Sequence, residues 1–151
     1  MTDIPLTLES MIEELLRRMG FDPRVTVREV GQMLTADVEL REGSGALIGR
    51  GGEGIDALEE ITRRLIRRRF GEVPRVALDV NGYRRELATA LREHARDIAE
   101  QVKRSGATYS FNPMHARERR IVHLELATRA DVITESVGEG PARHVVVRPA
   151  P

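Results

Sequence analysis

The sequence predicts an α+β protein made of two small modules in series. Apolar residues recur at helical spacing in some segments and alternate in others, which distinguishes helices from strands. The pair Asn81-Gly82 is a strong tight-turn signal between two such series of elements. Before the turn the predicted order is α-β-β-α-α-β, and after it the order is α-β-α-β-β. We therefore place the two modules at residues 1–81 and 82–151.

The first module is predicted to open with a helix and two strands. Apolar residues between Leu6 and Met19 follow helical spacing, and Gly20 ends that helix. Residues 25–27 are β-branched and predict a strand, and residues 33–40 alternate. One face of this second strand carries only apolar side chains: Leu34, Ala36, Val38 and Leu40.

Two helices and a strand complete this module. A short helical turn is expected at 46–48, and the main helix runs from about Glu53 to Phe70, where Gly71 ends it. A strand at 76–80 then leads to the central turn. The predicted buried stripe of the main helix consists of Ile55, Leu58, Ile61 and Leu65.

The second module is predicted to begin with a long helix at about 83–103 and a short strand at 108–111. Asn112-Pro113 combines a helix cap with a proline suited to the first helical position, so a second helix is expected from there to about Ala127. Two alternating segments predict the arms of a closing hairpin, residues 132–137 and 144–148.

Composition restricts the function more than the fold. The 151 residues are 40% hydrophobic and 32% charged, and a formal net charge of zero argues against a strongly basic nucleic-acid binder. The chain has no cysteine, which excludes disulfides and cysteine-ligated zinc. No apolar run approaches the ~20 residues that cross a membrane. The histidines lack metal-ligand spacing and no catalytic serine motif occurs, so we expect no metal, no cofactor and no enzymatic activity.

The most informative stretch of the chain is Gly49-Arg50-Gly51-Gly52. A Gly-x-x-Gly turn lets the backbone approach another molecule with no side chain in the way. This turn leads into the N-terminus of the helix that begins near Glu53, whose free N–H groups and positive dipole end favour a phosphate. Arg50 adds a formal charge at the same place. The pattern predicts a clamp for a nucleic-acid backbone, and a plain tight turn into a helix is the alternative.

The same glycines also match the dinucleotide-binding pattern Gly-x-Gly-x-x-Gly, from Gly49 to Gly54. In a dinucleotide fold the first glycine follows a strand directly, whereas here the preceding strand ends at Leu40, well before the glycines. The candidate ribose ligand, Asp79, lies inside its strand, and the chain lacks alternating βαβ units. We therefore expect no dinucleotide site.

An arginine-rich run occupies the second half of the main helix. Glu59 precedes Arg63 by four residues and Glu60 precedes Arg64 by four, so two ion pairs are expected on a solvated helix face. Such a face is also the alternative interpretation of the whole run. Three arginines lack an acidic residue four positions upstream and are predicted to be available for phosphate: Arg67, Arg68 and Arg69.

A second candidate contact is the spacing Arg119-x-x-x-His123 in the second module. Residues four apart share one face of a helix, so both side chains are expected to project outward while Ile121 faces the core. Arginine and a histidine that donates a hydrogen bond are both suited to phosphate. A surface arginine beside a partly buried histidine would give the same spacing and remains the alternative.

Taken in order, these motifs resemble the Jag (SpoIIIJ-associated) family of bacterial RNA-binding proteins. That family joins a KH domain to an R-three-H domain, the latter named for its Arg-x-x-x-His signature. The similarity covers nearly the whole chain, and several ordered blocks are more specific than any one of them. The blocks are Leu47–Gly52 with Leu58, Leu78–Arg84, Asn112–Met114, Glu118–His123, and Ser136–Pro141 with Arg143.

The resemblance implies a KH domain (α-β-β-α-α-β) at 1–81 and an R-three-H domain (α-β-α-β-β) at 82–151. It also implies binding of single-stranded RNA, with single-stranded DNA as a further ligand, through residues 49–52 and through Arg119 and His123. The implied role is a cytoplasmic post-transcriptional regulator linked to cell elongation, cell division or membrane-protein insertion. A small single-KH protein is the implied partner.

Two departures from the family pattern leave an alternative open. Gly51 stands where relatives usually carry a larger and often basic residue, which removes one side-chain contact. Many relatives also carry a further N-terminal domain, so functions that depend on it are not implied here. Together with the zero net charge, Gly51 favours an alternative function, a protein-interaction adaptor whose KH fold does not bind RNA. A nuclease or nucleotide-dependent enzyme is the other alternative, which metal-dependent turnover of RNA or a compact cluster of carboxylates would favour.

Overall fold

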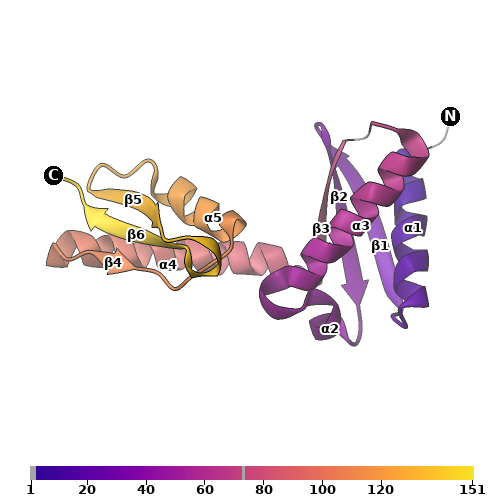
Figure 1. Ribbon diagram of the computed structural model, residues 1–151, viewed down its shortest axis with the longest axis horizontal. Coiled ribbons are helices and arrows are strands. Elements are labelled where there is room, and N and C mark those ends of the chain that lie inside the picture. The colour runs from indigo at the N-terminus through magenta and orange to yellow at the C-terminus, as the bar shows by residue number, and fades with distance from the viewer. Residues whose placement is uncertain (1–2, 73) are drawn as a thin grey trace. The chain divides into compact units, whose positions relative to one another are not determined.

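The computed structural model describes residues 3–72 and 74–151, and it divides the chain into two compact units, residues 1–85 and 86–151 (Figure 1). Each unit combines helices with a small three-stranded sheet. The predicted α+β class and the predicted order of elements are confirmed in both units. Within the described residues no helix is both long and apolar enough to span a membrane.

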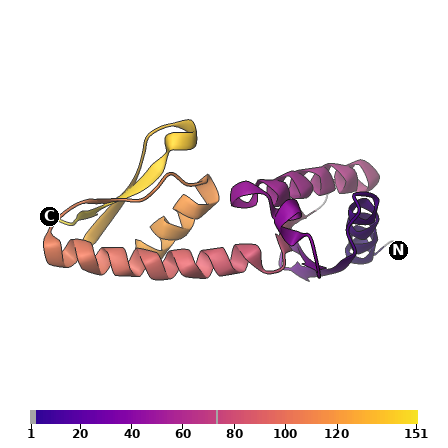
Figure 2. The same ribbon diagram turned by 90° about the horizontal axis from the view of Figure 1, so that it is seen from below.

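The first unit is a three-stranded sheet with helices on one face (Figures 1 and 2). Its strands lie in the order β1-β2-β3; β1 is antiparallel to β2, and β2 is parallel to β3. The strands are β1 (Pro23–Val30), β2 (Met33–Leu40) and β3 (Arg75–Val80). The two covering helices are α1 (Ile4–Arg18) and α3 (Glu53–Phe70).

The core of this unit confirms the strand prediction and corrects the helix prediction. All four predicted residues of β2, from Leu34 to Leu40, are buried. On α3, however, Ile61 is 45% exposed and Leu65 39% exposed, whereas Thr62 and Ile66 are buried. In each pair the two residues are four positions apart, and each pair continues the stripe of Ile55 and Leu58 equally well. Helical spacing alone therefore cannot decide which pair is buried. Packing against α1 and the sheet selects the Thr62 side of the helix.

Both edge strands of this sheet have backbone N–H groups bonded to glutamate side chains. On β1, the Val27 N–H donates to Glu9 Oε1 at 2.8 Å, and the Val25 N–H donates to Glu13 Oε1 at 3.2 Å. On β3, the Leu78 N–H donates to Glu59 Oε2 at 3.0 Å. Unpaired edge groups are a template for pairing with another chain. These glutamates therefore satisfy the edges and fix α1 and α3 against the sheet.

The second unit packs two helices with an antiparallel sheet of order β4-β6-β5. Its core draws apolar side chains from both helices and all three strands. Figure 2 shows α4 along one side of the unit, with α5 and the β5–β6 hairpin on the other. The elements are α4 (Tyr83–Ser105, which begins in the first unit), β4 (Tyr109–Ser110), α5 (Ala116–Leu126), β5 (Val132–Val137) and β6 (His144–Pro149).

Helix α5 begins later than predicted. It starts at Ala116 rather than at Asn112-Pro113, and the His115 N–H donates to Glu118 Oε2 at 2.7 Å as in a capping box. The reason is that the backbone before Ala116 is hydrogen-bonded to another part of the unit. The Met114 N–H donates to the Arg143 carbonyl at 3.2 Å, in the connection between β5 and β6. This tertiary bond holds the segment extended.

We expect that removing Glu9 destabilises the β1 edge. Glu9→Ala leaves the buried Val27 N–H without its charged acceptor, which should lower the free energy of unfolding by about 1–2 kcal/mol. Urea unfolding gives this value, and hydrogen exchange at the Val27 amide should accelerate. The control is Glu14→Ala, which removes only an exposed pair with Arg18 and should cost less than about 0.5 kcal/mol. Equal effects of the two substitutions would contradict the edge role.

Candidate nucleic-acid interface

The Gly-x-x-Gly turn has a backbone that glycine is needed to form. It lies between α2 (Ser44–Ile48) and α3, and its middle forms a single 3₁₀ turn, Arg50–Gly52. Three of its four residues have positive φ angles: Gly49 (71°), Gly51 (59°) and Gly52 (86°). Residues with a Cβ rarely adopt this region, so the glycines are required by conformation. The same geometry leaves the backbone of Gly49 and Gly51 exposed.

A close approach of α2 and α3 holds the turn. A Cβ added to Gly54 would lie 2.0 Å from the Leu47 carbonyl oxygen, and one added to Gly49 would lie 2.9 Å from the Gly54 nitrogen. Gly54 therefore serves helix packing, and this accounts for the last glycine of the dinucleotide-like pattern. The sheet has one antiparallel pair, and α2 separates β2 from the glycines, so the rejection of a dinucleotide fold is confirmed.

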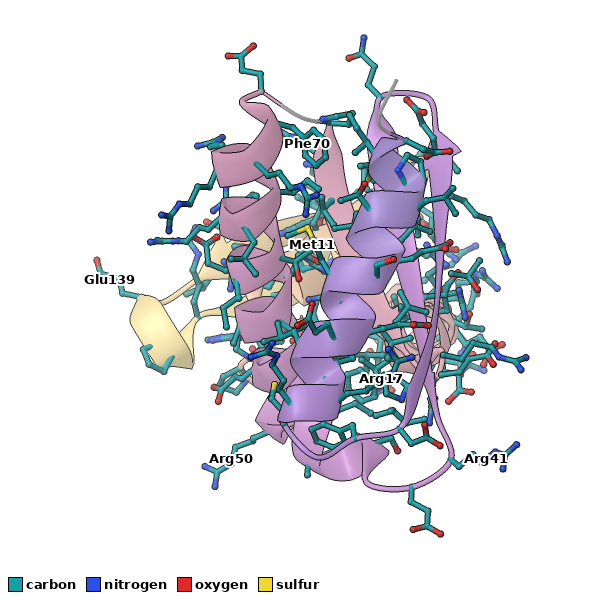
Figure 3. All side chains as sticks on the ribbon, turned by 90° about the vertical axis from the view of Figure 1, so that its right-hand side faces the viewer. Met11, Arg17, Arg41, Arg50, Phe70 and Glu139 are labelled. Carbon is teal, nitrogen blue, oxygen red and sulfur yellow. The ribbon has the colours of Figure 1, made fainter. Side chains whose placement is uncertain are left out.

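The turn has charges that favour an anion and charges that oppose one. No side chain caps the N-terminus of α3, and the N–H groups of Gly52 and Glu53 donate to the carbonyls of Gly49 and Arg50 within the turn. The positive end of the helix dipole is therefore what favours an anion at this turn. Arg50 is exposed and extends away from the body of the unit (Figure 3). Glu53 and Asp56 lie in the first helical turn, where they suit the helix dipole and oppose an anionic ligand. Asp56 is ion-paired with Arg84, which leaves Glu53 as the opposing charge.

The other predicted arginines of α3 lie far from the turn. Arg67 and Arg68 are exposed in the last turn of this 18-residue helix, which puts them roughly 20 Å from its N-terminus. Arg69 lies over the Phe70 ring, 5.8 Å from its centroid. The structure therefore does not bring these arginines together with Arg50. One nucleic-acid strand would have to follow the length of α3 to contact both ends.

One predicted ion pair of this helix forms and the other does not. Arg64 Nε donates to Glu60 Oε1 at 2.6 Å, as expected for residues four apart. Arg63 also pairs with Glu60, because Glu59 turns toward β3 instead. The Glu59 carboxylate accepts a hydrogen bond from Arg84 Nη1 at 2.6 Å.

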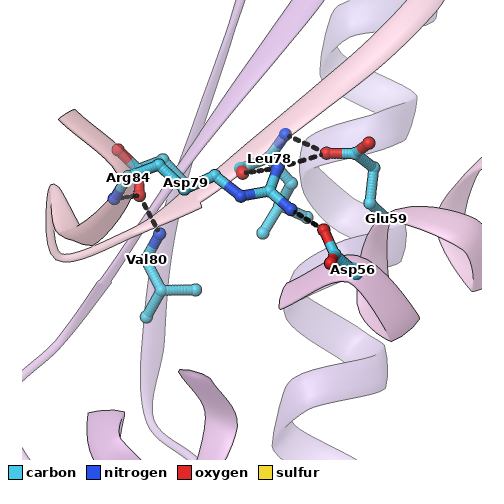
Figure 4. Close-up of polar contacts among 6 residues, drawn as sticks. All are labelled: Asp56, Glu59, Leu78, Asp79, Val80 and Arg84. Carbon is cyan, nitrogen blue, oxygen red and sulfur yellow. Dashed lines mark hydrogen bonds and ion pairs between the residues drawn. The ribbon is translucent and has the colours of Figure 1, made fainter. Parts of the chain in front are cut away.

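The motif Leu78–Arg84 has a structural role, which the contacts of Arg84 and Asp79 show (Figure 4). Its Nη1 also donates to the Leu78 carbonyl at 2.9 Å, and its side chain is only 15% exposed. Asp79 Oδ1 accepts from the backbone N–H groups of Val80 and Arg84, each at 2.9 Å. Asp79 therefore caps the first turn of α4 and is not placed to bind a ribose.

The predicted turn at Asn81 is confirmed and has a clear cause. Asn81 has a positive φ of 50°, which asparagine tolerates better than most residues. Its side-chain oxygen accepts from the Leu40 N–H at 2.8 Å, and its amide donates to the Leu40 carbonyl at 2.9 Å. The end of β2 is thereby joined to the turn that leads into α4.

The Arg119 and His123 pair is less exposed than predicted. Val122 and Leu126 are the buried residues of α5, and Ile121 is only half-buried, so the expected inward residue is wrong by one position. Both Arg119 and His123 are half-buried. The cause is the docking of α5 against β5, which turns His123 toward that strand. The alternative of a partly buried histidine describes His123 better than an outward projection.

His123 contacts two hydroxyl groups. Its Nδ1 lies 2.7 Å from Thr134 Oγ1, and its Nε2 lies 2.8 Å from Ser136 Oγ. Arg119 Nη1 donates to the Met114 carbonyl at 2.8 Å. Thr134 and Ser136 were not among the predicted site residues. Their signal in the sequence is a pair of hydroxyl residues two positions apart, on one face of the predicted strand 132–137.

The surroundings of His123 lower its pKa below the ordinary value of 6.5. Burial is the larger cause because it disfavours the charged imidazolium, and the positive charge of Arg119 adds to the effect. The imidazole is therefore neutral at pH 7. Among the described residues no group of three or more side chains has an arrangement that could hold a metal ion.

Known proteins match the second unit and, more broadly, most of the chain. The R-three-H domain model matches residues 89–149. RNA-binding protein KhpB of Clostridium symbiosum is 33% identical over 129 residues, which cover 85% of this chain and 58% of that protein. RNA-binding protein KhpB of Bacillus subtilis (strain 168) is 33% identical over 125 residues, 82% of this chain and 60% of that protein. These matches confirm the similarity to the Jag family that the ordered motifs predicted. It spans little more than half the length of these two curated relatives.

We expect the free energy of unfolding to depend on pH through His123. Because its pKa is lower in the folded protein than in the unfolded chain, the unfolded state binds more protons between the two values. Stability should therefore fall as the pH drops from about 6.5 through the folded pKa, and then level off. Thermal unfolding between about pH 7.5 and pH 4.5 measures this. His123→Gln should show a shallower pH dependence, and identical slopes would contradict the assignment.

Proposed function

We propose that this chain binds single-stranded RNA, with single-stranded DNA as a further ligand. The proposed modules are a KH domain at residues 1–81 and an R-three-H domain at 82–151. The observation that carries the proposal is the exposed glycine turn at the uncapped N-terminus of α3, with Arg50 beside it. The names of the relatives as RNA-binding proteins support it. The proposed contacts are Gly49, Arg50, Gly51, Gly52, Arg67, Arg68, Arg119 and His123.

The proposed cellular role follows from the family resemblance. It is that of a cytoplasmic post-transcriptional regulator linked to cell elongation, cell division or membrane-protein insertion, with a small single-KH protein as partner. We propose binding without catalysis, since the candidate contacts consist of a glycine turn, arginines and a neutral histidine. None of these is a pair of acid and base groups matched to a reaction.

A second candidate function is a protein-interaction adaptor. Three observations favour it: the opposing charge of Glu53 beside the turn, the missing side chain at Gly51, and the exposed apolar pair Ile61 and Leu65 on α3. An adaptor would use the helical face in place of the turn. A binding assay against RNA separates the two functions.

The turn is tested by reversing one charge. Arg50→Glu should weaken binding to a short single-stranded RNA, and it should lower the slope of log affinity against log salt by about 0.7, the value for one lost phosphate contact. Fluorescence anisotropy over a salt series gives both quantities. Gly51 is left unchanged in this variant because its φ of 59° makes any side chain there strained.

The matched control is Arg41→Glu, which changes the net charge equally. Arg41 is exposed at the same end of the unit but projects on the opposite side from Arg50 (Figure 3). The control should retain the wild-type slope, and both variants should keep the wild-type melting temperature. Equal loss in the two variants would indicate non-specific charge effects and contradict the clamp. No binding of the wild-type chain to RNA, at any salt concentration, would favour the adaptor.

A further inference from the structure

Both ring nitrogens of His123 are already engaged in the second unit. Thr134 Oγ1 lies 2.7 Å from Nδ1 and Ser136 Oγ lies 2.8 Å from Nε2, both within normal hydrogen-bond range. A neutral imidazole has one N–H donor and one acceptor nitrogen. It therefore has no donor left for a phosphate while both hydroxyls are in place. The direct phosphate contact that the Arg-x-x-x-His spacing suggests would require at least one of these bonds to break.

We infer that His123 is a positioning residue, and that one of the two hydroxyls it contacts, on Thr134 or Ser136, forms an anion site with Arg119. The ligand is a phosphate of the nucleic-acid backbone, so the inference rests on the proposed function and deepens it. It replaces the His123 donor on α5 with a hydroxyl donor on β5. The site then consists of the Arg119 guanidinium from α5 and one hydroxyl from the neighbouring strand.

The hydrogen-bond capacities of the three groups support this arrangement. One hydroxyl donates its proton to the acceptor nitrogen of His123, and the other accepts from the N–H of the ring. The hydroxyl that accepts keeps its own proton free for a further acceptor. A phosphate oxygen is such an acceptor, and hydroxyl side chains commonly contact the nucleic-acid backbone. The N–H of His123 occupies one lone pair of this oxygen and so restricts the directions open to its O–H. Loss of His123 should therefore weaken the contact, although His123 does not touch the phosphate.

Arg119 is oriented by a separate set of contacts. Its Nη1 donates to the Met114 carbonyl at 2.8 Å, and the Met114 N–H donates to the Arg143 carbonyl at 3.2 Å. A guanidinium has five N–H donors, so several remain for a phosphate. The contact at Met114 thus joins the start of α5 to the connection between β5 and β6. The segment from Ser136 to Arg143 therefore contributes in two ways. Ser136 supplies a hydroxyl, and the Arg143 carbonyl holds Met114, which in turn accepts from Arg119.

The connection after Ser136 is tight enough to keep this arrangement fixed. Gly138 has a φ of 87°, and a Cβ there would lie 3.1 Å from the Ala142 carbonyl oxygen. A larger residue would push the two arms of the connection apart. This gives Gly138 a structural reason to be glycine, and it ties the geometry of the hydroxyls to that of Arg143.

The test is a double-mutant cycle in the full chain with a short single-stranded RNA. Ser136→Ala should weaken binding by about tenfold, the usual effect of losing one hydrogen bond to a charged group. Thr134→Val, which keeps the side-chain volume, tests the other hydroxyl in the same way, and at least one of the two variants should show this loss. Adding His123→Ala to the variant that shows the loss should cost less than about twofold more, because groups that act as a unit are not additive.

Two variants separate loss of the hydroxyl from loss of the fold. Ser136→Thr keeps a hydroxyl and suits a strand, so it should bind within about twofold of the wild-type chain. Ser110→Ala removes an exposed hydroxyl from β4 and should change nothing. Melting temperatures are compared for every variant. Weak binding by Ser136→Ala that Ser136→Thr fails to restore would assign Ser136 a structural role and overturn the inference.

The remaining outcomes distinguish this inference from the proposed function. If the wild-type chain binds RNA but Ser136→Ala and Thr134→Val bind equally well, while His123→Ala is weak, His123 contacts the phosphate directly and the inference is wrong. The proposed function then still stands. If the wild-type chain does not bind RNA, both are overturned. Additive effects of His123→Ala and Ser136→Ala would also contradict a positioning role, since they would show two independent contacts.

Discussion

The close approach of α2 to α3 is the constraint on which the first candidate site depends. The Leu47 carbonyl occupies the space that a side chain at Gly54 would need, so the two helices meet backbone to backbone. A chain that reverses between helices this close must pass through positive φ angles, and Gly49, Gly51 and Gly52 adopt them. The exposed backbone of Gly49 and Gly51, at the positive end of α3, is a consequence of this packing. Affinity for a phosphate would therefore come from the backbone, which suits a chain with no net charge.

The second candidate site is built on a different principle. Its polar groups are side chains, and each is held by another: His123 by two hydroxyls, and Arg119 by a backbone carbonyl. Burial of His123, and to a lesser extent the charge of Arg119, lowers the pKa of the imidazole and keeps it neutral. The charge at this place is then concentrated on one guanidinium. Both candidate sites thus have few formal charges and many fixed dipoles, which is compatible with the balanced composition of the chain.

Much of the fold could be predicted from the sequence, and the exceptions share a cause. The strand at 33–40 was predicted fully because alternation permits only one choice of buried face. On α3, Ile61 and Thr62 both continue the helical stripe, and apolar character favoured the wrong one. The start of α5 was misplaced because Met114 bonds to Arg143, a residue distant in sequence. Local pattern fails where a tertiary contact decides between two locally equivalent options.

The sequence by itself determined the order of the elements, the Asn81-Gly82 turn and the glycine turn, because periodicity and backbone preference are local properties. Only the tertiary structure decided what surrounds each functional side chain. It turned His123 toward Thr134 and Ser136, and it placed the side chain of Arg84, which is 15% exposed, against the carboxylates of Asp56 and Glu59. These neighbours come from segments that are remote in sequence. Their distances depend on how whole helices pack on sheets, and no spacing of residues along the chain contains that information.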